Sequence, residues 1–284
     1  MKSKPECFPC SLRQMIITAR KVTNDNAQIK AILDEAGRTF SALSLDQAPA
    51  EITWECFKIA TRLLGINDPY KEEKYNYDLA AMRLLPRLRK ALDDTDNRLR
   101  VAIGLAIAAN MIDLGIVTEP NLDDLVERAM TTVLAIDDSD ELIRDLNSSG
   151  SLLYIGDNAG EIGFDMLLIE ELKKLTNIEV RFAVKGGPVM NDATIEDAML
   201  VGLSEVADVI TTGSNYLGVS CEKCSPAFVH ALKTAGVVIA KGHANFETMP
   251  DCNDRTYHLL TVKCEPVAKE LGVRILDSVL WRRM

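Results

Sequence analysis

Short apolar segments alternate with helical stretches through the second half of this chain, from Ser149 onward. Repetition of this kind is typical of a mainly parallel β-sheet covered by helices, with right-handed crossover connections. The predicted strands are Ser151–Ile155, Glu179–Val184, Val206–Thr211, Val237–Ala240, Tyr257–Val262 and Val273–Leu276. The helices expected between the first four strands are Phe164–Leu175, Thr194–Leu203 and Pro226–Ala235. The sequence therefore predicts an α/β fold for this half.

The first half follows a different pattern. Residues 11–136 give one helical segment after another, with no alternating or β-branched run long enough for a strand. In Ala50–Leu64, for example, apolar residues recur at spacings of three and four, as in a helix that buries one face. We expect the last of these helices to run to about Ile136. The polar stretch Asp137–Ser148 marks the boundary, which predicts an all-α domain over 1–140 and an α/β domain over 141–284.

The charge of the chain restricts its partners. The 284 residues carry 32 Lys and Arg against 42 Asp and Glu, a net charge of −10, which repels nucleic acid and anionic membranes. No apolar run approaches the ~20 residues of a membrane helix, and the first residues lack the apolar core of a signal peptide. We predict a cytoplasmic protein without a nucleic-acid or membrane partner. The sequence leaves its oligomeric state open.

Four segments that follow predicted strands combine glycine with charged or amide side chains. Ligands of an open parallel sheet bind outside the carboxyl ends of its strands, so these segments are expected to meet at one edge. Glycine permits close approach of the backbone to a ligand, and carboxylate and amide oxygens suit a hard divalent cation. The segments are Gly156–Glu161, Lys185–Asp192, Thr212–Asn215 and Lys241–Glu247.

Two kinds of group are expected at this edge. Asp157, Asn158 and Asp192 supply oxygen atoms of the type that Mg²⁺ or Mn²⁺ prefers. Lys241 and the backbone of Gly213–Ser214 supply positive potential for an anion. The alternative is structural, because Asp and Asn after a strand commonly form turns or cap helices. Since turn chemistry does not explain lysine at two strand ends, the set indicates a metal next to a phosphate.

Several of these motifs, in this order, resemble the damage-control phosphatases, formerly a domain-of-unknown-function family, with an ARMT-like metal-binding domain. The matching segments are Gly156–Glu161, Lys185–Thr194 and Lys241–Glu247, together with Cys7–Cys10 and Asp68–Tyr70. The resemblance covers nearly the whole chain and is to archaeal or bacterial members with an N-terminal Cys-x-x-Cys. It implies a helical N-terminal region on a three-layer Rossmann-like domain. It also implies metal-dependent hydrolysis of phosphate monoesters, such as sugar phosphates or damaged phosphometabolites.

The resemblance assigns roles to individual residues. It places the metal on the positions matching Asp157, Asn158 and Asp192, and makes the position matching Lys241 a phosphate contact. We expect Asp157, Asp192 and Lys241 to be catalytic, with Mg, Mn, Co or Ni as the divalent cofactor. The nucleophile stays open between Asp157, which would form an aspartyl phosphate, and a metal-bound water with Asp192 or Glu161 as its base.

A second group of residues is expected to contact a small phosphorylated metabolite. Glu161 has an alternative role, because a carboxylate also stabilises the first turn of a helix. Asn110 follows a nearly all-apolar helical segment, where a buried amide needs a partner, and Asp113 lies three residues further on. An interhelical hydrogen bond or a cap is the alternative for Asn110, and Ala109 stands where the family tends to have glycine. The expected substrate contacts are Gly213, Ser214, Asn215, Asn245, Asn110 and Glu161.

Five of the seven cysteines form a separate candidate site. Cys7 and Cys10, like Cys221 and Cys224, have the Cys-x-x-Cys spacing of zinc sites, and Cys264 is a further potential ligand. Dithiol or disulfide chemistry is one alternative, and burial as small apolar side chains is another.

Three functions remain to be compared. The leading hypothesis is a metal-dependent phosphatase. The second is an S-adenosylmethionine-dependent protein carboxyl methyltransferase, an activity also described for members of the family, although Gly156–Gly160 lacks the more open glycine pattern of such cofactor loops. The third is a binding protein without catalysis, in which the cysteine pairs sense metal or redox state.

Overall fold

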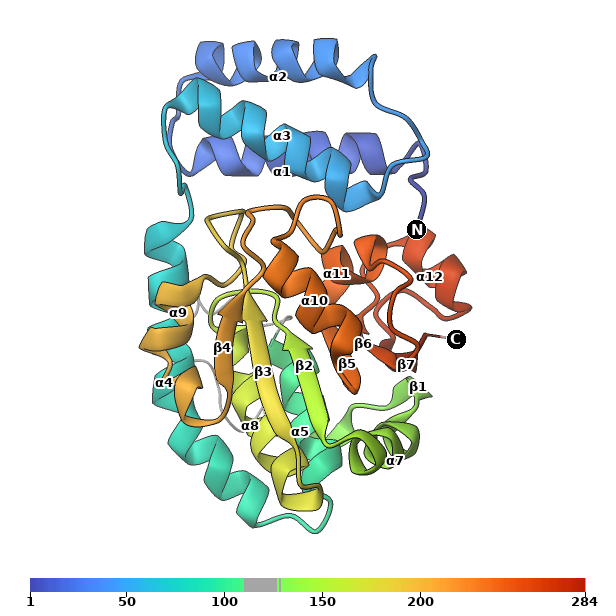
Figure 1. Cartoon of the computed structure of the whole chain (residues 1–284). Helices are drawn as coiled ribbons and strands as arrows, with labels where there is room; N and C mark the ends of the chain where they lie inside the picture. The colour runs from blue at the N-terminus through green and yellow to red at the C-terminus, as the bar shows by residue number, and fades with distance from the viewer. Residues whose placement is uncertain (110–126, 128, 284) are drawn as a thin grey trace.

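A sheet of seven strands forms the centre of the computed structural model, which describes residues 1–109, 127 and 129–283 (Figure 1). The strand order is β1-β7-β6-β5-β2-β3-β4. The strands are β1 (Leu134–Asp137), β2 (Ser151–Ile155), β3 (Glu179–Val184), β4 (Asp208–Thr211), β5 (Val237–Lys241), β6 (Thr256–Thr261) and β7 (Ser278–Arg282). β2 to β6 run parallel, whereas β7 is antiparallel to β6 and parallel to β1. The carboxyl ends of five strands therefore lie at one edge, called the carboxyl edge below.

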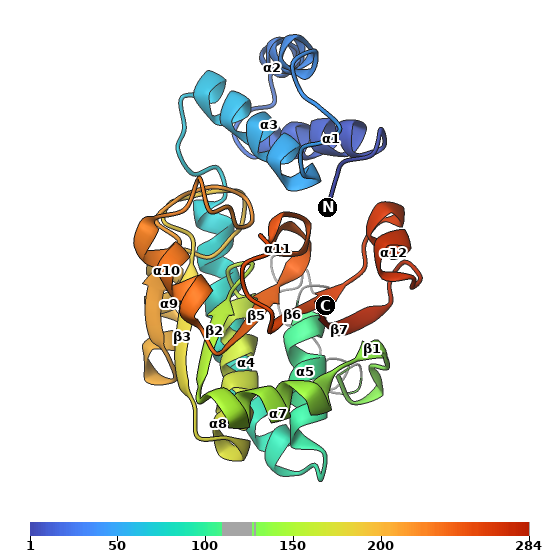
Figure 2. The same cartoon turned by 45° about the vertical axis from the view of Figure 1, so that its right-hand side comes forward.

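Helices cover both faces of this sheet, which confirms the expected α/β fold (Figure 2). The central strands β2, β5 and β6 are buried on both sides. Their apolar residues alternate between the layers: in β2, Leu152 and Tyr154 face one layer, and Leu153 and Ile155 face the other. One layer holds α4 (Lys71–Asp93), α5 (Arg98–Ala108), α7 (Ser139–Ser149) and α8 (Glu161–Leu175). The other holds α10 (Pro226–Thr234), α11 (Gly242–Thr248) and α12 (Glu265–Leu271). Between β3 and β4 lie α9 (Ile195–Leu200) and the 3₁₀ turn η2 (Leu203–Glu205).

Three N-terminal helices form a small bundle above the carboxyl edge (Figure 1). They are α1 (Cys7–Arg20), α2 (Asn26–Phe40) and α3 (Pro49–Leu64). Local sequence sets the bounds of α3, because Pro49 is favourable in its first turn and Gly65 ends it in the left-handed conformation with φ +67°. Apolar residues of α3, Ala50 and Phe57, pack with Val189 and Leu217 from two loops of the edge. This packing holds the bundle over the edge.

Two secondary-structure predictions were wrong. The segment expected to be helical as far as Ile136 contains β1, because Leu134–Asp137 pairs with β7, a partner that no local pattern shows. The last strand is not Val273–Leu276 but β7. Gly272 ends α12 with φ +70°, and the residues after it form a turn in which Leu276 N donates to Val262 O at 2.7 Å.

The predicted division near residue 140 stays a prediction, but helices from the first half share a core with the sheet. α4 and α5 pack against α8 in the largest apolar cluster, which also contains Tyr154 and Phe182 of the sheet. Among the described residues, none of the helices combines the length and apolar character needed to cross a membrane.

Candidate active site

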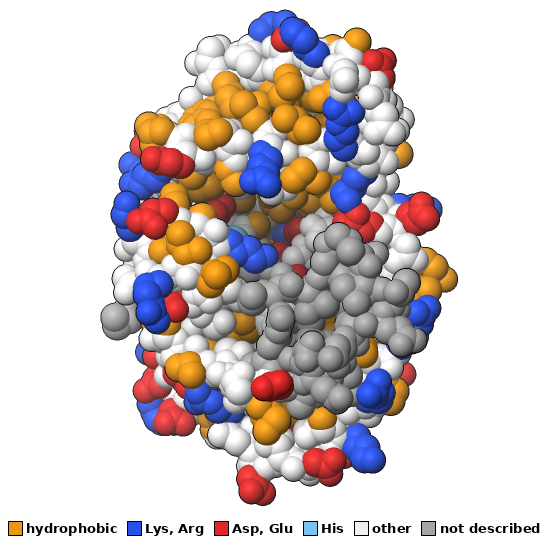
Figure 3. Space-filling view, turned by 180° about the vertical axis from the view of Figure 1, so that it is seen from behind, with side chains coloured by type: hydrophobic (Ala, Val, Ile, Leu, Met, Phe, Trp, Pro, Cys, Tyr) orange, Lys and Arg blue, Asp and Glu red, His pale blue; other side chains and the backbone are white. Residues whose placement is uncertain are grey.

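The site lies where the order of the strands in the sheet reverses. β2 continues to β3 and β4 on one side, while its other neighbour β5 continues to β6, and a crevice at such a switch point is the usual ligand site of an open α/β sheet. Asp157 follows β2 by two residues, and Lys241 is the last residue of β5. Seen from behind, the surface is hollowed between the N-terminal helices and the α/β part, with charged side chains of both signs around the hollow (Figure 3).

Backbone hydrogen bonds bring together the two loops that carry the predicted metal ligands. Ala159 N donates to Asn191 O at 2.9 Å, and Ala193 N donates to Asp157 O at 2.9 Å. Asn158 and Asp192 thereby form an antiparallel bridge. The structure thus places Asp157, Asn158 and Asp192 next to one another, although 35 positions separate the first from the last.

The Asn158 amide lies between two carboxylates. Its Nδ2 donates to Glu161 Oε1 at 2.6 Å and to Asp157 Oδ2 at 3.2 Å. An ionised carboxylate only accepts hydrogen bonds, so these two acceptors hold the NH₂ group of Asn158 and thereby fix the orientation of its amide. Glu161, expected to contact substrate, therefore orients Asn158 in this structure.

Asp192 is buried beside a lysine. Lys185 Nζ lies 3.4 Å from Asp192 Oδ2 as an ion pair without hydrogen-bond geometry, and it donates to Gly218 O at 2.8 Å. Asp192 Oδ2 therefore has no hydrogen-bond partner among the described residues. A buried carboxylate oxygen without a donor is costly, and a bound cation would satisfy it.

Asp157 touches a glycine that no other residue type could replace without a shift. Gly242 has φ +79°, and a Cβ added to it would lie 2.0 Å from Asp157 Oδ2. The first residue of α11 is therefore glycine for two reasons: its backbone conformation, and its contact with a carboxylate of the site.

Lys241 is buried, and two hydrogen bonds hold its ammonium group. Its Nζ donates to Asp165 Oδ1 at 2.6 Å and to Ala106 O at 2.9 Å. Tyr154 OH donates to the same Asp165 oxygen at 2.7 Å. Burial by itself would lower the pKa of Lys241, but the charges of Asp165 and Glu161 outweigh burial and raise it, so the ammonium stays charged.

The buried charges of the site do not balance. Four carboxyl groups, from Asp157, Glu161, Asp165 and Asp192, accompany the two lysines Lys185 and Lys241, which leaves two negative charges in excess when all are ionised. Burial, with the charge of Asp157, raises the pKa of Glu161 to about 7. Burial and Asp157 also raise the pKa of Asp192 to about 7, although Lys185 opposes them. A divalent cation would restore neutrality.

The predicted substrate contacts are partly brought together. Gly213 and Ser214 lie against the loop after β3, where Gly186 N donates to Ser214 O at 2.9 Å, and Asn215 lies 3.6 Å from the position a Cβ on Gly187 would take. Asn245 lies deeper, with Nδ2 donating to Gly156 O and Lys241 O and with Oδ1 buried without a partner in the described part of the chain. The predictions for Asn110 and Asp113 lie outside the described residues.

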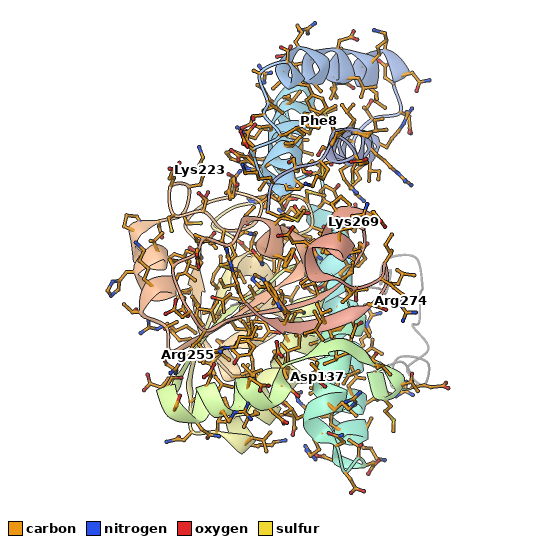
Figure 4. All side chains as sticks on the ribbon, turned by 90° about the vertical axis from the view of Figure 1, so that its right-hand side faces the viewer. Phe8, Asp137, Lys223, Arg255, Lys269 and Arg274 are labelled. Carbon is orange, nitrogen blue, oxygen red and sulfur yellow. The ribbon has the colours of Figure 1, made fainter. Side chains whose placement is uncertain are left out.

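Aromatic and basic side chains meet beside the edge. Trp54 of α3 packs edge-on against Tyr216, with ring centroids 5.1 Å apart. Lys58 Nζ lies 3.8 Å from the centroid of the Trp54 ring, and Lys223 Nζ lies 5.9 Å from it. Figure 4 shows Lys223 on a loop beside the N-terminal helices. These contacts join the N-terminal bundle to the loop after β4 and add positive charge there.

All seven cysteines are free thiols. Within the described ranges, no group of three or more His, Cys, Asp or Glu side chains is arranged to hold a metal ion. Cys224 is buried in the apolar core beside α10, whereas Cys221 is exposed. The zinc and dithiol roles of Cys7, Cys10, Cys221, Cys224 and Cys264 stay predictions.

Asp165 was not among the residues singled out from the sequence, and Lys185 was noted there only as a lysine at a strand end, without a role of its own. Asp165 is the one charged residue of Ile162–Ile169, an otherwise apolar stretch of α8. A charge inside such a run needs a buried partner, so this pattern could have pointed to an ion pair. Its partner, Lys241, comes from tertiary structure alone.

The residues present fit a divalent cation: two carboxylates and an amide side chain lie on two loops joined by a backbone bridge, one of these carboxylate oxygens is buried without a donor among the described residues, and the local charge is negative. Fold and site together define a Rossmann-like α/β protein with an acidic, lysine-flanked centre at its topological switch point. The chain belongs to the family described as the damage-control phosphatase ARMT1-like domain, whose model matches residues 3–279.

Relatives match over nearly their full length. The chain is 34% identical to a damage-control phosphatase of Archaeoglobus fulgidus, covering 98% of each protein. It is 35% identical to a damage-control phosphatase of Pyrococcus horikoshii, covering 96% of this chain and 95% of that protein. The crystal structure of a DUF89 family protein from Pyrococcus horikoshii superimposes with a TM-score of 0.93 at 33% identity, covering 100% of both chains.

Proposed function

We propose that this protein is a metal-dependent phosphatase that hydrolyses phosphate monoesters of small metabolites, such as sugar phosphates or damaged phosphometabolites. The observation that carries the proposal is the convergence of Asp157, Asn158 and Asp192 at one edge with two buried lysines. Family membership and the two relatives named damage-control phosphatases support the same activity.

Asp157, Asn158 and Asp192 would hold the cation, with Mg, Mn, Co and Ni as candidates. When bound, it would polarise a phosphoryl oxygen and neutralise charge that develops during hydrolysis. Asp157 and Asp192 contribute negative charge to this site, and Asn158 contributes an oxygen without charge. Glu161 keeps that oxygen in place by holding the other end of the amide.

Lys241 supplies a fixed positive charge beside the metal site. Asp165 and Ala106 O hold its ammonium group, so the charge is in place before the substrate binds. The backbone of Gly213–Asn215 and the side chain of Asn245 complete the proposed phosphate contacts. Asp157, Asp192 and Lys241 are the proposed catalytic residues.

Two routes to the product remain. In one, an Asp157 oxygen attacks phosphorus and a water molecule later hydrolyses the aspartyl phosphate; in the other, water attacks directly and gives its proton to Asp192 or Glu161. Mass spectrometry after an acid quench distinguishes them, because only the first route leaves a phosphoryl group on Asp157.

The test is phosphate release from p-nitrophenyl phosphate and a panel of sugar phosphates. Chelator-stripped protein receives Mg²⁺, Mn²⁺, Co²⁺ or Ni²⁺ singly, and Asp157→Ala is the matched variant, with its fold checked by circular dichroism. Metal-dependent release that Asp157→Ala loses would support the proposal. If the folded protein releases no phosphate with any of these metals but binds S-adenosylmethionine, the result would favour the methyltransferase. A ligand response changed by Cys10→Ser and not by Asp157→Ala would favour the binding protein.

A further inference from the structure

We propose that helix α4 positions the two loops that carry the metal ligands, through a largely buried polar network of Asp68, Lys74, Asp78 and Asp197, called the α4 network. This inference rests on the proposed function, because it concerns the geometry of the same site. The four residues are positioning residues: none of them is among the ligands proposed above.

The first contact fixes the loop after β2. Asp78 is fully buried, and its Oδ1 accepts a hydrogen bond from Gly160 N at 2.7 Å. Gly160 has φ +78° and precedes the first residue of α8, so it is the point where the loop bearing Asp157 and Asn158 enters the helix. A carboxylate from α4 thus sets the end of the first ligand loop.

The second contact fixes the loop after β3. Lys74 is 3% exposed, and its Nζ lies 3.1 Å from Asp68 Oδ2 and 3.4 Å from Asp197 Oδ2. Asp197 Oδ2 also accepts hydrogen bonds from Thr194 N and Thr194 Oγ1, each at 2.7 Å. Thr194 lies two residues after Asp192 and is the N-cap residue just before α9, so the network also fixes the end of the second ligand loop.

Helix α4 would pack against α8 without these polar groups. Ala81 and Leu85 of the same helix already lie against α8 at Gly163, where an added Cβ would meet the Ala81 Cβ at 3.2 Å. Burying a charged group costs desolvation free energy, and an apolar side chain of similar size does not have this cost. The polar groups of the network instead accept directional hydrogen bonds from the backbone at Gly160 and Thr194, which apolar contacts cannot do.

The experiment measures Mn²⁺ binding by isothermal titration calorimetry, with kcat and KM for p-nitrophenyl phosphate beside it. Asp78→Ala removes the acceptor of Gly160 N, and we expect Mn²⁺ binding to weaken about 10- to 100-fold, as for loss of an outer partner of a ligand. Asp78→Asn keeps a carbonyl oxygen at this place and should restore most of the affinity. Lys74→Met is expected to weaken Mn²⁺ binding in the same direction, and it serves as the test if Asp78→Ala does not fold.

Glu171→Ala is the matched control. Glu171 is a buried carboxylate held by Arg98 near the other end of α8, about 15 Å along the helix from Glu161. Its loss should lower stability and leave Mn²⁺ affinity unchanged. Wild-type Mn²⁺ affinity in folded Asp78→Ala or Lys74→Met would overturn this inference alone. A wild-type protein that binds none of Mg²⁺, Mn²⁺, Co²⁺ and Ni²⁺ would overturn the proposed function and this inference with it.

Discussion

Gly242→Ala is the sharpest test of the geometry at the metal site. The new Cβ would lie 2.0 Å from Asp157 Oδ2 and 2.4 Å from Asp157 Cγ, and ordinary contact begins near 3.4 Å. The carboxylate must therefore move by about 1.4 Å, or the backbone of α11 must move instead. Metal sites tolerate ligand displacements of only about 0.2 Å, so Asp157 would leave its position as a ligand.

The expected effects follow from that displacement. A misplacement of about 1 Å costs about 100-fold in activity, equivalent to about 2.7 kcal/mol in the activation barrier. Mn²⁺ affinity should fall along with the activity. The positive φ of +79° adds a backbone penalty of about 1–2 kcal/mol, which lowers the free energy of unfolding without concerning the metal.

Gly272→Ala separates the two effects. Gly272 has φ +70°, and a Cβ there meets nothing within 4 Å. It should show the same backbone penalty in urea unfolding, with unchanged Mn²⁺ affinity and phosphate release. The reasoning is refuted if Gly242→Ala binds Mn²⁺ and releases phosphate like the wild type, or if Gly272→Ala loses both.

Three further predictions follow from the same contacts. Glu161→Ala frees the Asn158 amide to rotate, so the Mn²⁺ affinity measured by calorimetry should fall about 10- to 100-fold. Glu161→Gln keeps an acceptor for this amide and should lose less affinity. Equal losses in the two variants would contradict the role of Glu161. Tyr154→Phe removes a hydrogen bond to the Asp165 carboxylate and should lower the free energy of unfolding in urea by about 1.5–3 kcal/mol; no change would show that the bond is not formed. Burial, with the charge of Asp197, raises the pKa of Asp78 to about 8 from 3.8, so folded wild type keeps a proton that the unfolded chain releases. As the pH rises between these two values, the free energy of unfolding of the wild type in urea should fall relative to that of Asp78→Asn, by at most about 1.4 kcal/mol per pH unit. If the difference between the two proteins stays constant with pH, Asp78 is not neutral in the folded protein.

Much of the fold could be predicted because its evidence is local. Apolar runs such as Ser151–Ile155 and Val237–Ala240 carry their own pattern, and the structure has strands at both places. β1 and β7 were misjudged because they depend on pairing with distant segments: β1 pairs only with β7, and β7 lies between β1 and β6. Short strands of this kind carry a weak pattern of their own.

The candidate site, like the fold, has features that the sequence predicted and features that it did not. Loops after parallel strands must meet at one edge, so the proximity of Asp157, Asn158 and Asp192 followed from strand order within the sequence. The hydrogen-bond partners of the site residues could not be predicted in this way. Asp165 contacts Lys241, and Glu161 contacts the Asn158 amide, because of the way α8 packs against the sheet.

The sequence by itself determined the layered α/β architecture and the residue types gathered at the carboxyl edge, because hydrophobic periodicity and turn chemistry act over a few neighbouring residues. Tertiary structure alone decided which charges face one another. Asp78 of α4 reaches Gly160 across 82 positions, and Lys74 reaches Asp197 across 123. Such pairs form only when the hydrophobic core brings distant segments together, since no local pattern encodes a partner so far along the chain.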